Sequence, residues 1–209
     1  MRLCGLCGDH AVSSEGVLVT LWVTGWEERT PLSSTQTAAG WLSPQGIDEV
    51  RDRVPIVYVE AIPARVDHLG RLERVGLLLR QRPDGTISRA LVSGRVLYGE
   101  TLREALWRNL AKDLGPEASP QLPPSPSPFT VAEYFPDDAL GTGYIDPRQH
   151  AVALAYLVAV EGECTPPADT LDLAWLSPQE AVTPAVSAEM TGGQDRLVRL
   201  ALAAAGSLP

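Results

Sequence analysis

The chain has 209 residues, 44% of them hydrophobic, and its 17 basic and 26 acidic side chains give a net charge of −9. This length suits one domain with extensions and allows a sizeable buried core. The acidic balance argues against a broad nucleic-acid or anionic-membrane surface but permits a local basic pocket. No uncharged run reaches the roughly 18 residues that span a bilayer. We therefore expect a cytoplasmic protein that binds neither nucleic acid nor membranes.

Residues 1–40 differ in character from the rest of the chain. They contain a short apolar run at 16–26 and then a polar stretch, Thr30–Gly40, that is typical of a linker or loop. We predict an N-terminal extension over 1–40, which is a small appendage, a strand or poorly ordered. An α/β domain over 41–185 and a C-terminal helix within 186–209 are predicted to follow.

The three cysteines do not define a site. Cys4 and Cys7, with His10 close behind, have the spacing of half a zinc site or of a redox pair. No second pair follows and Cys164 is isolated, whereas a structural zinc site normally has four ligands. We interpret these cysteines as incidental.

The folded body alternates predicted strands and helices. Ser43 followed by Pro44 is typical of a helix N-terminus and predicts a short helix. Two β-rich runs, Arg74–Arg82 and Thr86–Val92, are separated by a Pro-Asp-Gly turn and predict a hairpin. Strands interleaved with helices indicate a layered, mixed α/β domain. The other predicted elements are strands at Pro55–Val66, Phe129–Phe135, His150–Val160 and Leu171–Leu176, a proline-rich loop at Glu117–Pro128, a helical turn opened by Ser177 and Pro178, and a helix at Gln194–Ala205.

The segment Ser93–Pro116 combines a glycine-containing loop with a well-marked helix. Thr101 and Glu104 fit a capping box at the helix start. Gly115 followed by Pro116 is typical of a helix end. A leucine at every fourth position predicts the buried face of the helix, formed by Leu102, Leu106, Leu110 and Leu114.

This segment resembles the Nudix box, the signature of Nudix pyrophosphohydrolases. The box has a Gly, a Glu six positions later, and then Arg-Glu, a hydrophobic residue, any residue, Glu-Glu, any residue and Gly. A later stretch, Asp172–Ala181, resembles the Trp-containing strand and following helix near the end of many Nudix domains. The resemblance extends over 41–185, is greatest to an uncharacterised Nudix-related subfamily, and implies a Nudix-type α/β/α sandwich with a mixed sheet. The matching box positions are Gly94, Glu100, Arg108, Leu110 and Gly115.

The box departs from the family at its metal ligands. Active members bind a divalent metal through three Glu, and those positions here hold Asn109, Lys112 and Asp113. Their spacing puts all three on one strip of the helix, but their charges sum to 0 where three Glu would carry −3. Mg²⁺ prefers oxygen ligands, commonly carboxylates plus substrate phosphates. Asp113, with the Asn109 amide oxygen, is the metal site that remains.

The resemblance also implies roles around this strip. Arg108 is expected to pair with Glu100 or with Asp113, and Glu100 is either a remnant of the ligand shell or part of the loop that positions the helix. Lys112 is either a solvated helix residue or a replacement for the metal, its ammonium pairing with a substrate phosphate. The catalytic candidates are Glu100, Arg108 and Asp113, and the ligand-binding candidates are Gly94, Arg95 and Lys112.

Residues outside the box offer two further expectations. Carboxylates such as Glu60, Glu133 or Asp146 would restore a metal site if they converged on Asp113. The loop around Asp146 is otherwise interpreted as a solvated acidic loop. Trp107 lies at the edge of the leucine stripe, and we predict that it belongs to the core rather than to a base-stacking surface.

Two functions are compatible with these residues. One is a catalytically impaired domain that binds a small phosphorylated ligand of the nucleoside diphosphate class, as a sensor or a partner-binding module, and needs no cofactor. The other is an active pyrophosphohydrolase that uses Mg²⁺ or Mn²⁺ and carboxylates outside the box, with metal-assisted attack of water on phosphorus. Family members often dimerise, so the resemblance is also compatible with a homodimer.

Overall fold

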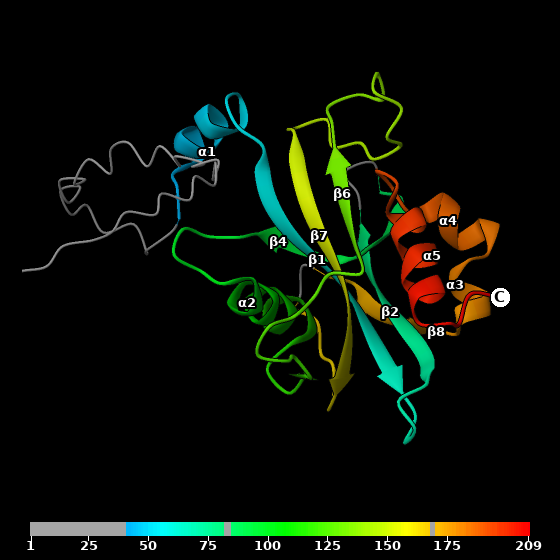
Figure 1. Ribbon diagram of the computed structural model, residues 1–209. Helices are drawn as coiled ribbons and strands as arrows, with labels where there is room; N and C mark the ends of the chain where they lie inside the picture. Colours follow the sequence, from blue (N-terminus) through cyan, green and yellow to red (C-terminus); the bar gives the residue numbers. More distant parts are fainter. Residues whose placement is uncertain (1–40, 82–84, 168–169) are drawn as a thin grey trace, which may run out of the picture. The chain divides into compact units, whose positions relative to one another are not determined.

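The computed structural model describes residues 41–81, 85–167 and 170–209. The predicted N-terminal extension, with Cys4 and Cys7, lies outside these residues. Eight strands form a mixed sheet (Figure 1): β1 (Ile56–Val66), β2 (Leu72–Gln81), β3 (Ile87–Ala90), β4 (Val92–Arg95), β5 (Ser119–Pro120), β6 (Thr130–Tyr134), β7 (Ala151–Glu161) and β8 (Asp172–Leu176).

β1 organises the sheet. One of its edges pairs in parallel with β7 over Ile56–Ala64. Its other edge is shared, since β4 pairs antiparallel with Tyr58–Ala61 and β2 with Ala64–Val66. β2 also pairs antiparallel with β3 and β8, and β7 pairs antiparallel with β5 and β6. The start of the box, on β4, is therefore held directly against the central strand.

Helices cover both faces of this sheet, with α2 on one face and α3, α4 and α5 on the other (Figure 1). The α/β/α sandwich predicted from the sequence is confirmed. None of the helices formed by the described residues has the length and apolar content needed to cross a lipid bilayer. The helices are α1 (Pro44–Arg51), α2 (Leu102–Leu114), α3 (Pro178–Ala181), α4 (Pro184–Glu189) and α5 (Gln194–Ala204).

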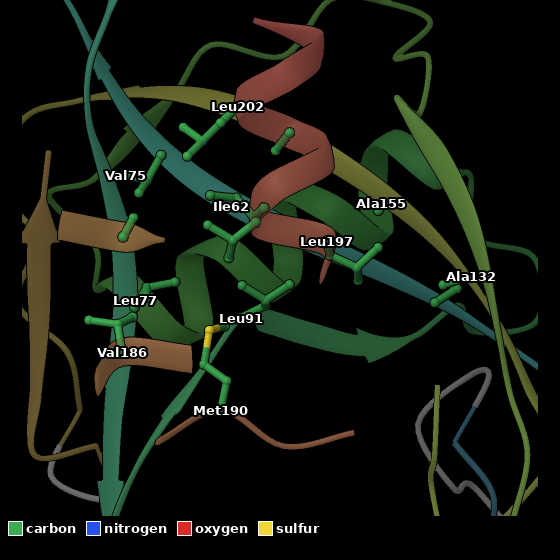
Figure 2. Packing of buried hydrophobic residues seen from close by; sticks show 14 of the residues in the cluster. Ile62, Val75, Leu77, Leu91, Ala132, Ala155, Val186, Met190, Leu197 and Leu202 are labelled. Atoms are coloured by element: carbon green, nitrogen blue, oxygen red, sulfur yellow. The ribbon is translucent and has the colours of Figure 1, made fainter. Parts of the chain in front are cut away.

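Two hydrophobic cores result from the alternation of side chains along β1. Val59 and Ala61 face α2, whose predicted leucine stripe is buried against them. Ile62 points to the opposite face and packs with Leu197 and Leu202 of α5 (Figure 2). Burial of each leucine side chain contributes about 1.5–3 kcal/mol. These two cores fix α2 and α5 on opposite sides of the same strand.

Two local predictions were wrong, and one helix was not predicted. The single strand expected at Thr86–Val92 is two strands, because the chain changes its partner from β2 to β1 at Leu91. The proline-rich loop begins with the short strand β5, whose Pro120 lies at the sheet edge, where a missing N–H is tolerated. Helix α4 was not expected, although Thr183 caps it by accepting a hydrogen bond from the Val186 N–H.

Candidate functional site

The box loop and α2 are fixed at both ends of the helix. Thr101 Oγ accepts a hydrogen bond from the Glu104 N–H at 3.2 Å, and the Glu104 carboxylate accepts one from the Thr101 N–H at 2.8 Å. This is the predicted capping box. At the other end Gly115 has φ 90°, and a side chain there would collide with the carbonyl oxygen of Thr165. The strip of α2 that carries the box residues is thus held in a set orientation.

Glu100 and Arg108 tie the box loop to the helix. Arg108 Nε and Nη2 donate to the two carboxylate oxygens of Glu100 at 2.6 and 2.8 Å. Arg108 Nη2 also donates to the carbonyl of Arg95, and Glu100 accepts from the Leu97 N–H. Hydrogen bonds from Arg108, with that of the Leu97 backbone, lower the pKa of Glu100. Of the two partners expected for Arg108, the structure shows Glu100.

Asn109 occupies the position of the first box Glu and is buried. Its Nδ2 donates to the carbonyl of Ala105 at 2.8 Å, which turns the amide oxygen towards β4. A side chain added at Gly94 would overlap this amide. The glycine at the start of the box is therefore required by the close approach of Asn109.

Asp113, at the position of the last box Glu, is held by two cations. Its Oδ1 lies 3.2 Å from Lys112 Nζ and 3.4 Å from Arg80 Nη2. The Asp113 side chain is 4% exposed, whereas Lys112 is 53% exposed and reaches Asp113 from the solvent side. Arg80 was missed from the sequence. It comes from β2, where Leu78 packs against α2 and alternation places Arg80 on the same face.

The side chains at the box do not fit a divalent metal on their own. Glu100 is engaged by Arg108, and Asp113 is engaged by Lys112 and Arg80. Across the part of the chain that the structure describes, no three His, Cys, Asp or Glu side chains lie close enough together to act as a ligand set. The negative charges of these carboxylates are balanced by protein cations. Mg²⁺ binding requires carboxylates whose negative charge is not balanced in this way.

Glu60 is the buried carboxyl of the sheet. It accepts hydrogen bonds from Tyr134 Oη at 2.9 Å and from Gln194 Nε2 at 3.0 Å, and burial raises its pKa. It lies on the α5 side of β1, whereas Val59 next to it faces α2. Glu60 therefore does not converge on Asp113, and the metal site that such a convergence would have restored is not formed.

The two other carboxylates considered from the sequence are also placed elsewhere. Glu133 is exposed on β6. Asp146 is largely buried, with 14% of its side chain exposed, and binds Arg148 through both oxygens as well as Gln149. The loop is solvated as expected at Asp137 and Asp138, which are exposed, whereas the Asp146 side chain is turned away from solvent by these donors.

Three hollows follow one another along the box, and we name them by their lining. The polar cavity, of about 540 Å³, and the cationic hollow, of about 430 Å³, share Tyr58 and Ser93. The cationic hollow and the aromatic hollow, of about 610 Å³, share Leu97 and Arg108. The polar cavity also contains Glu60, Arg80, Tyr134, Asp146 and Gln194, the cationic hollow Trp41, Arg95, Asn109 and Lys112, and the aromatic hollow Tyr98, Arg103, Glu104 and Trp107.

Trp107 does not belong to the core. It is 45% exposed and lines the aromatic hollow with Tyr98, which is 84% exposed. The prediction of a core residue was wrong because Trp107 lies beside the leucine stripe rather than in it, on the same face of α2 as Arg103 and Glu104. Arg103 and Glu104 lie four and three residues before Trp107, and this helical spacing was the signal in the sequence that the three side chains share one face.

Solved structures share this architecture. Nudix hydrolases from Clostridium perfringens and Nitrosomonas europaea align with TM-scores of 0.52 and 0.51 at 14% and 16% identity. They cover 75% and 72% of this chain, and the alignments span 99% and 90% of those proteins. At such low identity the likeness shows the Nudix fold. A comparison with curated proteins finds no match.

A structure from Jonesia denitrificans is far more similar. It is 55% identical, aligns with a TM-score of 0.73, and the alignment covers 75% of this chain and 98% of that one. That protein is described as a possible asymmetric diadenosine tetraphosphate (Ap4A) hydrolase. Residues 37–207 also match the family model "Domain of unknown function (DUF4916)". The chain belongs to the DUF4916 family, and its fold is that of Nudix hydrolases. In this DUF4916 chain, Asn109 occupies the box position of the first Glu and Asp113 that of the third.

Proposed function

We propose that this chain binds a ligand of the nucleoside diphosphate class along the box, and that metal-dependent hydrolysis is weak or lost. The observation that carries the proposal is the pairing of Asp113 with Lys112 and Arg80. In the proposed arrangement, two protein cations occupy the place beside the carboxylate that a metal would take.

Electrostatics supports this exchange. Two unit charges about 4 Å apart interact by about 4 kcal/mol at an effective dielectric constant of about 20. A divalent cation beside Asp113 carries two charges, so at this distance Lys112 and Arg80 would each repel it about twice as strongly. A phosphate group would be attracted by the same two side chains, and Lys acts on phosphate as a point charge.

The cationic hollow supplies a surface for phosphates. Arg95, Arg108 and Lys112 line it, and no carboxylate is among the described residues that do so. The charge of Arg108 is balanced by Glu100. Lys112 shares the single charge of Asp113 with Arg80, which leaves Arg95 and one net positive charge around Asp113 to meet an anion. Gly94 brings the backbone of β4 close to this surface, because no side chain intervenes.

The polar cavity next to it has the size of a small-molecule site. Its volume of about 540 Å³ lies in the usual range of about 300–1,000 Å³ for ligand pockets. Polar groups of Glu60, Tyr134 and Gln194 face each other there. Arg80 lines the cavity and reaches Asp113, so a ligand in the cavity would extend its phosphates towards the box.

A second candidate is an active hydrolase that uses Mg²⁺ or Mn²⁺. It is favoured by the Jonesia denitrificans protein, whose description as a possible asymmetric Ap4A hydrolase suggests a dinucleoside polyphosphate as the substrate. Asp113 and the Asn109 amide oxygen would then hold the metal together with ligand phosphates, while Glu100 and Arg108 keep the loop in place.

The two candidates are separated by measuring binding and turnover on the same ligands. Calorimetric titrations in EDTA would use ADP, ATP, ADP-ribose and diadenosine tetraphosphate, and product release would be followed with Mg²⁺ or Mn²⁺. We expect binding of at least one ligand without metal. The variant Lys112→Gln should weaken it about tenfold, which corresponds to about 1.4 kcal/mol.

Two controls define the outcomes. Arg53→Gln removes one exposed positive charge that lines none of the three hollows, and its affinity should equal that of the wild type. Metal-dependent turnover that is abolished in Asp113→Asn would establish the hydrolase instead. Absence of both binding and turnover would contradict both candidates.

A further inference from the structure

The aromatic hollow contains two large side chains whose exposure the fold does not explain. Tyr98 is 84% exposed on the box loop, and Trp107 is 45% exposed on α2. Both line one hollow of about 610 Å³. Neither side chain is needed to close the core beneath, because the leucine stripe of α2 already does so.

The charges of this hollow exclude a second phosphate site. Glu100 and Glu104 line it together with Arg103 and Arg108, so that two negative and two positive charges balance. Glu104 is further engaged by the capping box, and Glu100 by Arg108. An uncharged, flat group is the ligand that such a surface favours. Aromatic side chains stack on any nucleobase, because every base has a π-face.

The position of the hollow relates it to the ligand proposed above. Leu97 and Arg108 line both the aromatic and the cationic hollow, and Tyr58 and Ser93 line both the cationic hollow and the polar cavity. The order along the box is therefore a cavity with polar groups, a cationic surface and an aromatic surface. This order matches a molecule with a base at each end of a chain of phosphates.

We propose that Tyr98 and Trp107 form a second nucleobase subsite, so that the chain recognises two nucleosides joined through a polyphosphate. The inference rests on the proposed function, since the phosphates must lie over the cationic hollow. It assigns to these two aromatic residues a role in choosing between ligands with one base and ligands with two.

The test compares one-base and two-base ligands on the same variants. ATP and diadenosine tetraphosphate would be titrated in EDTA against the wild type, Trp107→Ala and Tyr98→Ala. Each variant should bind diadenosine tetraphosphate about tenfold more weakly and ATP within about twofold of the wild type, the tenfold loss being about 1.4 kcal/mol. Trp107→Phe and Tyr98→Phe retain a ring and should lose less.

One further variant controls for effects on the fold, and two outcomes would contradict the second subsite. Leu69→Ala changes an exposed apolar side chain, 62% exposed, in the turn between β1 and β2 and should leave both affinities unchanged. Equal losses for both ligands, or no loss for either, would overturn the second subsite while leaving the proposed function in place. Failure of the wild type to bind either ligand would overturn both. Trp fluorescence quenched by diadenosine tetraphosphate in the wild type but not in Trp107→Phe would support the subsite directly.

Discussion

Arg108 holds Glu100 through two parallel hydrogen bonds, and its second nitrogen also reaches the carbonyl of Arg95. One guanidinium thus joins the helix, the box loop and the end of β4. The segment that resembles the Nudix box keeps this connection even though Asn109, Lys112 and Asp113 stand at the positions of the three Glu ligands. The hydrogen bonds that hold the box loop to the helix therefore do not require the Glu residues that bind the metal.

Replacing Arg108 with Lys should lower the free energy of unfolding by about 1–2 kcal/mol, because an ammonium cannot form the paired hydrogen bonds of a guanidinium. Arg148→Lys is the matched control. Arg148 also binds a carboxylate through both nitrogens, that of Asp146, but is 67% exposed, and its replacement should cost no more than about 1 kcal/mol. Urea unfolding curves measure both, and equal losses would contradict the role given to Arg108.

Gly94→Ala should destabilise the fold by about 1–3 kcal/mol through overlap with the buried Asn109 amide. Asn109→Ala removes that amide, so the double variant should be more stable than the sum of the two single losses predicts. A double-mutant cycle from chemical denaturation measures the coupling. Strict additivity would show that the side chain at position 94 meets something other than Asn109.

Glu60 should give the protein a pH dependence of its own. An unfolded Glu titrates near pH ~4.3, and burial raises the pKa of Glu60 in the folded state. Below the unfolded value both states are protonated. Above it the unfolded chain releases its proton first, so the free energy of unfolding falls as pH rises until the folded pKa is passed.

Glu60→Gln removes this slope. It also places an amide group opposite Gln194 Nε2, which adds a loss that does not vary with pH. The stability of the variant relative to the wild type should therefore improve from pH 4 to pH 7, as measured by urea unfolding at each pH. Glu133→Gln, on an exposed carboxylate of β6, is the control for surface charge. A difference independent of pH would contradict the buried carboxyl as its source.

Lys112→Glu should increase the affinity of the box for Mn²⁺ at least about tenfold, because it removes a repelling charge and adds a carboxylate beside Asp113. Free Mn²⁺ measured by electron paramagnetic resonance gives the affinity. Arg53→Glu makes the same change of net charge away from the hollows and should have little effect. An unchanged affinity in Lys112→Glu would mean that the strip no longer has the geometry of a metal site.

Local signals in the sequence sufficed for most of the frame. Thr101 and Glu104 mark the start of α2, four leucines mark its buried face, and the alternating strands place the sheet between helices. The contacts that define the candidate site depend instead on pairing between distant segments. Arg80 reaches Asp113 only because β2 and β4 share one edge of β1, and no local pattern encodes that arrangement.

The side of the sheet occupied by Glu60 was equally beyond a local pattern. Alternation along β1 shows that Glu60 and Val59 face opposite ways, but only the placement of α2 and α5 decides which face adjoins the box. Trp107 is different. Its spacing from Arg103 and Glu104 already favoured the exposed face, and its place at the edge of the leucine stripe was wrongly taken as a sign of burial.

Lys112 is the only lysine of the chain, and its half-exposed amine lies beside Asp113. Amine-directed acylating reagents would therefore modify one side chain, that of Lys112 in the box. The mass of the peptide that contains Lys112 would then report how many copies have a covered box, and a ligand that shields Lys112 would slow the modification. A single residue thus gives direct chemical access to the part of the molecule on which the proposed function depends.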